Sequence, residues 1–292
     1  MTFLNFLISG ISLGSIYAII ALGYTMVYGI AKMLNFAHGD VIMVGAYICF
    51  YAVSRFDLPP LAGVILAMLV CTVLGMVVER LAYKPLRQAT SLAVLITAIG
   101  VSYFLQNSAL LIWGAAPKVY PPLISGTLKL FDGQLSISYV SLLTMAACIV
   151  IMVVLTTFTS KSKMGKAMRA CSEDKGAAQL MGINVNRTIS LTFAIGSGLA
   201  AIAGVLLCSS YPTLMPTTGS MPGIKAFTAA VFGGIGSIPG AFLGGILLGI
   251  IEALAKAYLS TQLSNSIVFA VLIVVLLVRP AGLLGKYVPE KV

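Results

Sequence analysis

The segment FLNFLISGISLGSIYAIIALGYTMVYGI, residues 3–30, carries no charged side chain. A helix needs about 20 mostly apolar residues to cross a bilayer, and an open sheet cannot satisfy its edge hydrogen bonds inside lipid. The segment therefore predicts a first membrane-spanning helix. It has no basic leader and is too long for the apolar region of a signal peptide, so we expect it to remain in the mature protein.

The composition extends this prediction to the whole chain. Of its 292 residues, 59% are hydrophobic and 9% are charged, and the mean hydropathy is +1.04, whereas soluble domains have about 25% charged residues. These values predict an all-α, polytopic integral membrane protein that forms a single domain over residues 1–292. The net charge of +10 arises in loops, where Lys and Arg orient membrane helices, so we expect no nucleic-acid partner.

Nine charge-poor segments predict the path through the membrane. We expect eight conventional spans and one short or broken helix, at residues 217–235, because Gly and Pro interrupt that segment. The nine segments are 3–30, 41–54, 61–78, 89–113, 137–158, 189–211, 217–235, 239–257 and 262–278.

Basic loops set the predicted orientation. Lys and Arg concentrate at 80–87, at 161–187 and in the tail from Arg279 to Lys291, and such loops lie on the cytoplasmic side of a membrane. Counting crossings between these loops predicts an external N-terminus and a cytoplasmic C-terminus. The remaining loops have few cations and are predicted to lie on the outer side. Their basic residues are Arg55, Lys118, Lys129 and Lys225.

The motif Asn35-Phe36-Ala37-His38-Gly39-Asp40 interrupts the first long apolar region. One interpretation is a broken transporter helix that faces a cavity, with Asn35, His38 and Asp40 on the translocation path. The other is an ordinary turn in which Asp40 caps the next helix through its side-chain oxygen. The single histidine and the isolated cysteines match no metal-ligand spacing, so we expect no cofactor.

A glycine-rich run, Gly233-Gly234-Ile235-Gly236-Ser237-Ile238-Pro239-Gly240, fits neither GxGxxG nor GxxxxGK[ST]. It predicts a tight reversal, with Gly233, Gly236 and Gly240 as candidates for gating. Small residues spaced four apart, from Gly236 to Gly244 and from Ala241 to Gly249, predict close helix packing. No phosphate-binding loop occurs in the sequence, so the chain is not expected to be an enzyme that hydrolyses ATP.

Glu252 and Lys256 stand four residues apart, which predicts a structural ion pair on one helix near the outer face. Other carboxylates are nearly absent from the predicted spans. A proton relay, as in proton-coupled carriers, therefore lacks its usual groups.

The basic loop, about residues 160–187, contains six Lys and Arg residues and a short helix signal. We expect the helix at 172–180, with Ser172 as its cap, Glu173 and Asp174 in its first turn, and its end at Gly182. Its small residues, such as Ala177 and Ala178, suit a groove on a soluble partner, whereas a helix resting on lipid needs large apolar residues.

Two motifs carry a family resemblance. Ala177-Ala178-x-x-x-Gly182 followed by Ile183 resembles the coupling-loop motif of bacterial ATP-binding-cassette importer permeases, although Gly176 stands where that motif has Glu. The 35–40 motif, with Gly45-Ala46-Tyr47, resembles the high-affinity branched-chain amino acid permeases. The resemblance continues to Arg279-Pro280-x-Gly282-Leu283 and covers nearly the whole chain.

This resemblance implies a multi-pass protein of the bacterial inner membrane that carries leucine, isoleucine and valine from periplasm to cytoplasm. It implies four kinds of partner: a second, related permease subunit, two cytoplasmic ATPase subunits, a periplasmic substrate-binding protein, and membrane lipid. The residues that it implies for ATPase coupling are Glu173, Asp174, Ala177, Ala178, Gly182 and Ile183.

Other functions stay open at this point. The same machine could carry urea or short amides, because the binding protein does most of the selecting. A stand-alone channel or secondary carrier would work without ATPases but leaves the long basic loop unexplained. A membrane enzyme would need a nucleophile or paired carboxylates. Glu79 with Arg80, and Glu173 with Asp174, are isolated pairs in loops.

Overall fold

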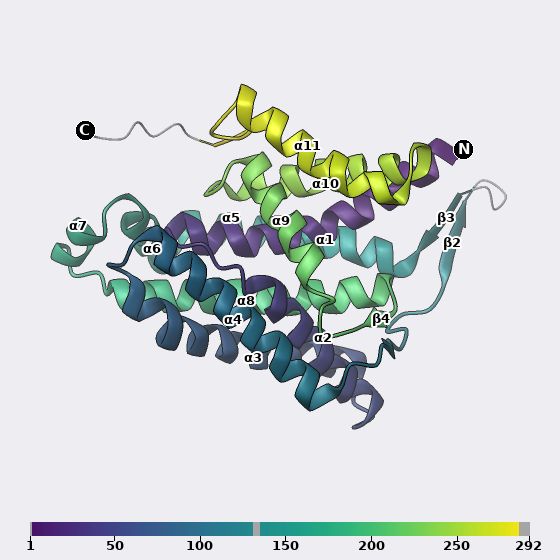
Figure 1. Ribbon diagram of the computed structural model, residues 1–292, viewed down its shortest axis with the longest axis horizontal. Coiled ribbons are helices and arrows are strands. Elements are labelled where there is room, and N and C mark those ends of the chain that lie inside the picture. The colour runs from purple at the N-terminus through teal and green to yellow at the C-terminus, as the bar shows by residue number, and fades with distance from the viewer. Residues whose placement is uncertain (1, 131–134, 286–292) are drawn as a thin grey trace.

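The computed structural model describes residues 2–130 and 135–285. The predicted helical path is confirmed, and Figure 1 shows most helices aligned with the long axis of the molecule. The α-helices are α1 (Thr2–Ala31), α2 (His38–Ser54), α3 (Pro60–Val78), α4 (Ser91–Trp113), α5 (Tyr139–Lys161), α6 (Lys163–Glu173), α7 (Lys175–Leu180), α8 (Val185–Ser210), α9 (Ser220–Gly233), α10 (Ile238–Tyr258) and α11 (Thr261–Val278). A π-helical turn, Glu79–Tyr83, and a 3-10 turn, Lys84–Leu86, follow α3.

Seven of these helices are long and apolar enough to cross a membrane: α1, α3 with its π-helical extension, α4, α5, α8, α10 and α11. The 17 residues of α2 and the 14 residues of α9 make both of them short. The expected short helix at 217–235 is present as α9, and α2 is a second short helix, because the chain is non-helical from residue 32 to residue 37. The predicted boundaries of the other helices are correct to within a few residues.

Helices α1 and α11 both run away from the end of the molecule at which α1 begins (Figure 1). Which end faces the cytoplasm stays a prediction, and Lys286 and Lys291 of the basic tail lie outside the described residues.

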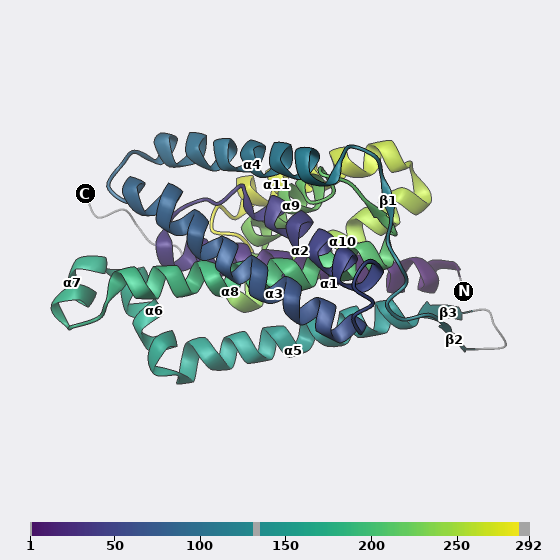
Figure 2. The same ribbon diagram turned by 90° about the horizontal axis from the view of Figure 1, so that it is seen from below.

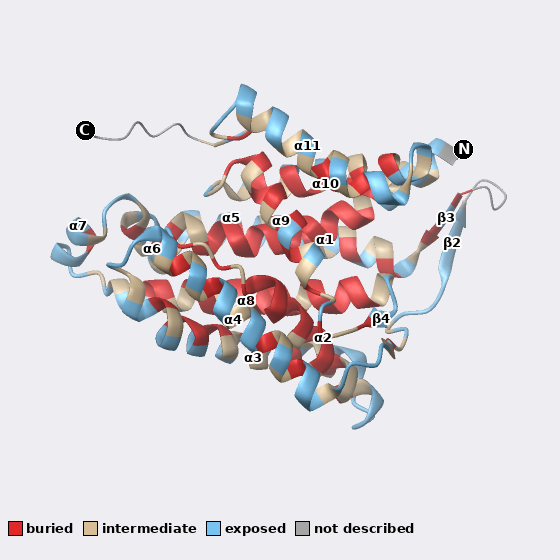
Figure 3. Ribbon diagram, in the orientation of Figure 1, coloured by how far each residue is buried: buried red, intermediate tan, exposed pale blue. Residues whose placement is uncertain are grey.

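Helices α1 and α8 form the buried centre of the bundle, as Figure 3 shows. Helix α10 packs along α1 with almost no side chain between the backbones, since a Cβ added to Gly14 would lie 2.7 Å from the Ile246 carbonyl oxygen and one added to Gly249 would overlap Gly14. Close van der Waals packing stabilises this helix pair, because no hydrophobic effect drives helices together in lipid. The predicted packing role of the glycine rows is confirmed.

The peripheral helices leave large apolar faces uncovered. Figure 2 shows α4 and α5 on opposite sides of the layer that holds α1 and α8. Only 11% of the most apolar 18-residue stretch of α11 is buried inside the protein, compared with 83% of the corresponding stretch of α8. Exposed apolar surface of this extent requires lipid or another apolar subunit.

Two short antiparallel pairs close the end of the molecule opposite α6 and α7 (Figure 1). Strand β1 (Lys118–Val119) pairs with β4 (Thr213–Leu214), and β2 (Thr127–Leu130) pairs with β3 (Leu135–Ser138). The first pair joins the loop after α4 to the loop that leads into α9.

Candidate functional site

The basic loop folds into two helices, not the single one expected at 172–180. Helix α6 begins after Ser162, whose hydroxyl accepts a hydrogen bond from Gly165 N at 2.8 Å. It ends at Glu173, and Asp174 then adopts an extended backbone, with φ −152° and ψ 117°. This break separates α6 from α7.

Asp174, not Ser172, caps α7. The Asp174 carboxylate accepts hydrogen bonds from Gly176 N at 2.7 Å and Ala177 N at 3.0 Å, whereas the Ser172 hydroxyl donates to the Arg169 carbonyl oxygen. The expectation of Ser172 as cap and of Glu173 in the first turn was therefore wrong. An Asp side chain is as good a cap as Ser, and only the break in the backbone selects it.

The predicted end of the helix at Gly182 is correct. Gly182 has φ +80°, which favours glycine, and Ile183 N donates to the Ala178 carbonyl oxygen at 3.0 Å. Ala178 is buried, whereas Leu180 is 90% and Met181 82% exposed. The tip of the loop therefore presents two large apolar side chains, which the prediction from small residues had missed.

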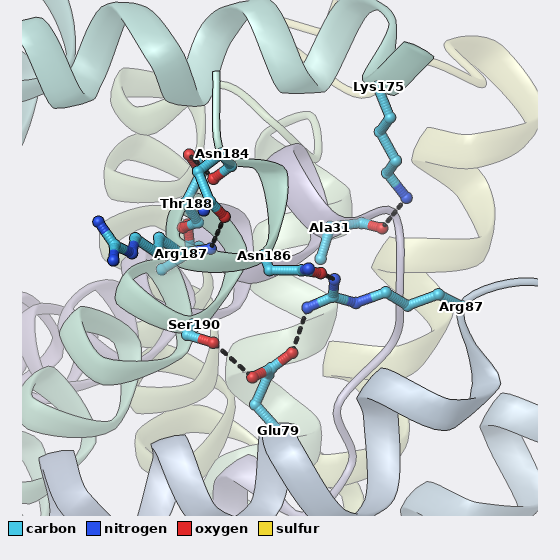
Figure 4. Close-up of polar contacts among 10 residues, drawn as sticks. Ala31, Glu79, Arg87, Lys175, Asn184, Asn186, Arg187, Thr188 and Ser190 are labelled. Atoms are coloured by element: carbon cyan, nitrogen blue, oxygen red, sulfur yellow. Dashed lines mark hydrogen bonds and ion pairs between the residues drawn. The ribbon is translucent and has the colours of Figure 1, made fainter. Parts of the chain in front are cut away.

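Polar contacts tie this loop to the membrane helices, as Figure 4 shows. Lys175 Nζ donates to the Ala31 carbonyl oxygen at the end of α1, at 2.9 Å. Burial, and then the nearby Arg87 and Lys32, lower the pKa of Lys175. The contact thus holds a cation against the negative end of the α1 dipole.

A second set of contacts joins the segment after α3 to the start of α8 (Figure 4). Arg87 bonds to both Glu79 and Asn186, and the Ser190 hydroxyl donates to the other Glu79 oxygen at 2.6 Å. Glu79 is buried and does not stand as an isolated loop pair with Arg80. Sequence spacing could not reveal this cluster, because its members come from three separate elements.

The 35–40 motif lies where α1 has ended and the chain turns back into the bundle. After Ala31 the chain is non-helical, with Lys32 at φ +58°, and α2 begins at His38 beside Gly23, where an added Cβ would lie 2.6 Å from His38 Nε2. Gly23 lies about 12 Å back along α1 from Ala31 at 1.5 Å per residue. This geometry favours the broken-helix interpretation.

The alternative role of Asp40 as a side-chain cap is wrong. Ala37 occupies the cap position of α2 without a side-chain hydrogen bond, and Asp40 instead accepts from Gln106 Nε2 at 2.8 Å. Asn35 accepts from the Tyr83 hydroxyl at 2.8 Å, and the buried His38 ring lies against Tyr24 with 4.6 Å between centroids. Asn35 and His38 therefore contact residues inside the bundle and stabilise the chain at the break.

The start of α9 meets the start of α2. A Cβ added to Gly219 would overlap the Gly39 carbonyl oxygen, and one added to Gly223 would lie 2.8 Å from Gly39 Cα. Two short helices therefore begin at one point inside the bundle, an arrangement of broken helices that transporters use around their substrates.

A hollow of about 460 Å³ lies between α2, α4 and α9 at this meeting point. The size falls in the range of roughly 300–1,000 Å³ for small-molecule sites. Its polar lining comes from Asp40, Ser102, Tyr103, Gln106 and Ser220, and its apolar lining includes Leu95, Ile99 and Ile224. Of the residues predicted for a path, Asp40 lines this hollow, and Asn35, His38, Gly233, Gly236 and Gly240 do not.

The glycine reversal packs closely, as expected. A Cβ added to Gly240 would lie 2.5 Å from the Gly233 carbonyl oxygen, and Gly236 has φ +94°. Gly236 lines a separate hollow of about 280 Å³ together with Met168 and Arg169 of α6. The reversal is thus a neighbour of the basic loop and lies away from the hollow at Asp40.

The predicted Glu252–Lys256 pair is present, with 2.6 Å between Lys256 Nζ and Glu252 Oε1, but it belongs to a larger buried cluster. Lys225 Nζ lies 2.7 Å from the same oxygen, and the Tyr17 hydroxyl donates to Oε2 at 2.9 Å. Lys225 is therefore a buried residue of α9, not part of an outer loop as expected. Its partners are distant in sequence, so spacing could not find them.

Comparison with known proteins decides the family. The model of the family "Branched-chain amino acid transport system / permease component" matches residues 6–277. The chain belongs to this family. It is 46% identical to the high-affinity branched-chain amino acid transport system permease protein BraD of Pseudomonas aeruginosa, over 99% of this chain and 98% of that protein.

Two further relatives carry similar descriptions. The high-affinity branched-chain amino acid transport system permease protein LivH of Escherichia coli K12 is 47% identical over 99% of this chain and 98% of its own length. A probable branched-chain amino acid transport permease protein LivH of Methanocaldococcus jannaschii is 28% identical over 79% of this chain and 74% of its own. The family and the apolar helices identify this chain as a multi-pass membrane permease.

Proposed function

We propose that this chain is one of two related permease subunits in an importer that carries leucine, isoleucine or valine from the periplasm to the cytoplasm. ATP hydrolysis in two separate cytoplasmic subunits drives the importer, and a periplasmic binding protein delivers the amino acid. The near full-length similarity to permeases of branched-chain amino acid transport systems supports the cargo.

The single observation that carries the coupling role is the position of α7. It lies at one extreme end of the molecule, beyond the membrane helices (Figure 1), and presents Leu180 and Met181 to the surroundings. Lys175 joins its base to Ala31, the residue before the 32–37 break. A partner that moves α7 would thus move the chain that leads directly to Asp40.

The predicted coupling residues divide into two groups in this proposal. Glu173, Asp174, Ala177 and Gly182 are exposed, and an ATPase subunit would contact this surface. Ala178 is buried and Ile183 half-buried, and they hold α7 against the bundle. The groove of the partner would receive Leu180 and Met181 together with the exposed small residues.

The second permease subunit would cover the apolar faces of the peripheral helices. The hollow at Asp40 opens where Tyr103 of α4 is 62% and Ile224 of α9 43% exposed, and Figures 1 and 2 place α4 and α9 on one side of the molecule. We place the translocation path along this side. Asn35 and His38 support the break beside it, and the reversal at Gly233, Gly236 and Gly240 takes up movement of α6.

The test of coupling uses the chain co-expressed with its partner subunits and reconstituted with the binding protein. Leu180→Asp should abolish both the ATPase activity stimulated by loaded binding protein and leucine uptake, because a carboxylate replaces an apolar docking group. Arg187→Gln, at an exposed residue of the same loop, is the matched control and should leave both unchanged. Normal stimulation in the Leu180→Asp complex would refute the coupling role of α7.

The same preparation tests the other functions. Leucine uptake by the purified chain alone in liposomes would indicate a channel or secondary carrier. The ligand that co-purifies with the binding protein decides between branched-chain amino acids and urea or short amides. The aliphatic lining from Leu95, Ile99 and Ile224 favours the former, because it matches a branched side chain.

A further inference from the structure

Asp40 differs from the other buried carboxylates of the described chain in having no cationic partner. Three acidic residues are buried: Asp40, Glu79 and Glu252. Glu79 pairs with Arg87 and Glu252 with Lys225 and Lys256, whereas no ion pair forms at Asp40 within the described ranges. Burying a carboxylate without a cation is costly.

The surroundings of Asp40 offset only part of this cost. Gln106 Nε2 donates a hydrogen bond at 2.8 Å, and Asp40 lies in the first turn of α2, where the helix dipole stabilises an anion. Neither supplies a full positive charge. The hollow beside Asp40 is large enough for a small organic cation.

The depth of the site fits a substrate on its way through the membrane. Gln106 lies about 22 Å along α4 from Ser91, in a helix about 34 Å long at 1.5 Å per residue. Ionisable residues inside a membrane mark substrate pathways. A ligand with both charges would also find donors here, since the Ser102 and Ser220 hydroxyls line the same hollow.

From these observations we propose that Asp40 binds the α-ammonium group of the transported amino acid in the hollow between α2, α4 and α9. Gln106 orients the Asp40 carboxylate and, at 3.2 Å from Ser220 Oγ, links it to α9. The Ser102 and Ser220 hydroxyls donate to the α-carboxylate, and Leu95, Ile99 and Ile224 contact the aliphatic side chain. This assignment rests on the proposed function and adds the group that recognises the amino acid itself.

The experiment measures ligand protection of a cysteine in the hollow. Ser220→Cys is introduced into the complete complex and alkylated by a hydrophilic thiol reagent; the native cysteines are all buried. Leucine and 3-methylbutylamine, which keep the ammonium group, should slow alkylation, and 4-methylpentanoate, which lacks it, should not. Asn107→Cys, exposed on the neighbouring face of α4, is the control and should show no protection.

Adding Asp40→Asn should raise the half-protecting leucine concentration about 10- to 100-fold, the usual worth of a hydrogen bond to a charged group. Equal protection by 4-methylpentanoate, or an unchanged concentration in Asp40→Asn, would overturn the proposal. So would a cysteine at 220 that reacts only in the isolated chain, because the partner subunit would then fill the hollow. If Asp40→Asn fails to assemble, the comparison of amine with acid decides alone.

Failure of the proposed function gives a different result. A wild-type complex that neither takes up leucine nor hydrolyses ATP in response to loaded binding protein contradicts the importer itself. A complex that transports leucine normally with Asp40→Asn, and with Ser220→Cys protected as before, contradicts only the role of Asp40.

Discussion

Substitutions of different residues in the buried cluster around Glu252 should destabilise the protein to different extents. Glu252→Gln removes the one anion between two cations and leaves Lys225, with 8% of its side chain exposed, without a counter-charge. Lys225→Met leaves Glu252 paired with Lys256 at 2.6 Å. The charge that remains buried after each change, and not the number of hydrogen bonds lost, should decide the stability.

The magnitudes follow from the geometry. Removing one partner of a buried ion pair costs about 3–5 kcal/mol when it leaves a buried charge, so we expect this loss for Glu252→Gln. Lys225→Met should cost about 1–2 kcal/mol less than that, since the remaining pair is neutral. Lys256 is 36% exposed, so Lys256→Met should cost only about 1 kcal/mol.

The assay is the free energy of unfolding of the purified protein in detergent or nanodiscs, measured in a double-mutant cycle. Glu252→Gln combined with Lys225→Met should recover much of the loss of Glu252→Gln alone, because it removes the stranded cation. Two results would refute the reasoning: equal losses for Glu252→Gln and Lys225→Met, or strict additivity in the double mutant.

Three further changes test other parts of the structure. Gly219→Ala should destabilise the protein by about 1–3 kcal/mol or more, because the added Cβ would overlap the Gly39 carbonyl oxygen. Gly100→Ala is the control and should not, because the space around its Cβ is open. Thermal unfolding measures both. Asp174→Ala should destabilise α7 by about 0.5–2 kcal/mol, seen as faster amide exchange confined to that helix, and exchange that stays unchanged would contradict the cap. The folded-state pKa of Lys175 is lowered from its ordinary value of 10.5, so protonation of Lys175 destabilises the folded state. As the pH increases from the lowered pKa to 10.5, the unfolding temperature should therefore rise more in the wild type than in Lys175→Met. Parallel curves of unfolding temperature against pH would contradict this.

Local patterns in the sequence were enough for the helices and the family. An apolar run of about 20 residues has few alternatives to a membrane helix, and the glycine rows from Gly236 to Gly249 predicted where backbones approach. The motif residues from Asn35 to Asp40 and the turn at Gly182 were also readable, because glycine and polar residues interrupt the apolar pattern there.

Only the tertiary structure decided which polar groups meet. Gln106 and Ser220 carry no distinctive local signal, yet they lie beside Asp40 because α4 and α9 pack around the start of α2. Lys225 was expected on the outer side, but it lies on α9 and bonds to the Glu252 carboxylate, which also accepts a hydrogen bond from Tyr17. Asp174 replaced Ser172 as a cap because the backbone breaks at that residue. The sequence determined the helices through local hydrophobicity, whereas the partners of buried charges depend on contacts between residues far apart in the chain.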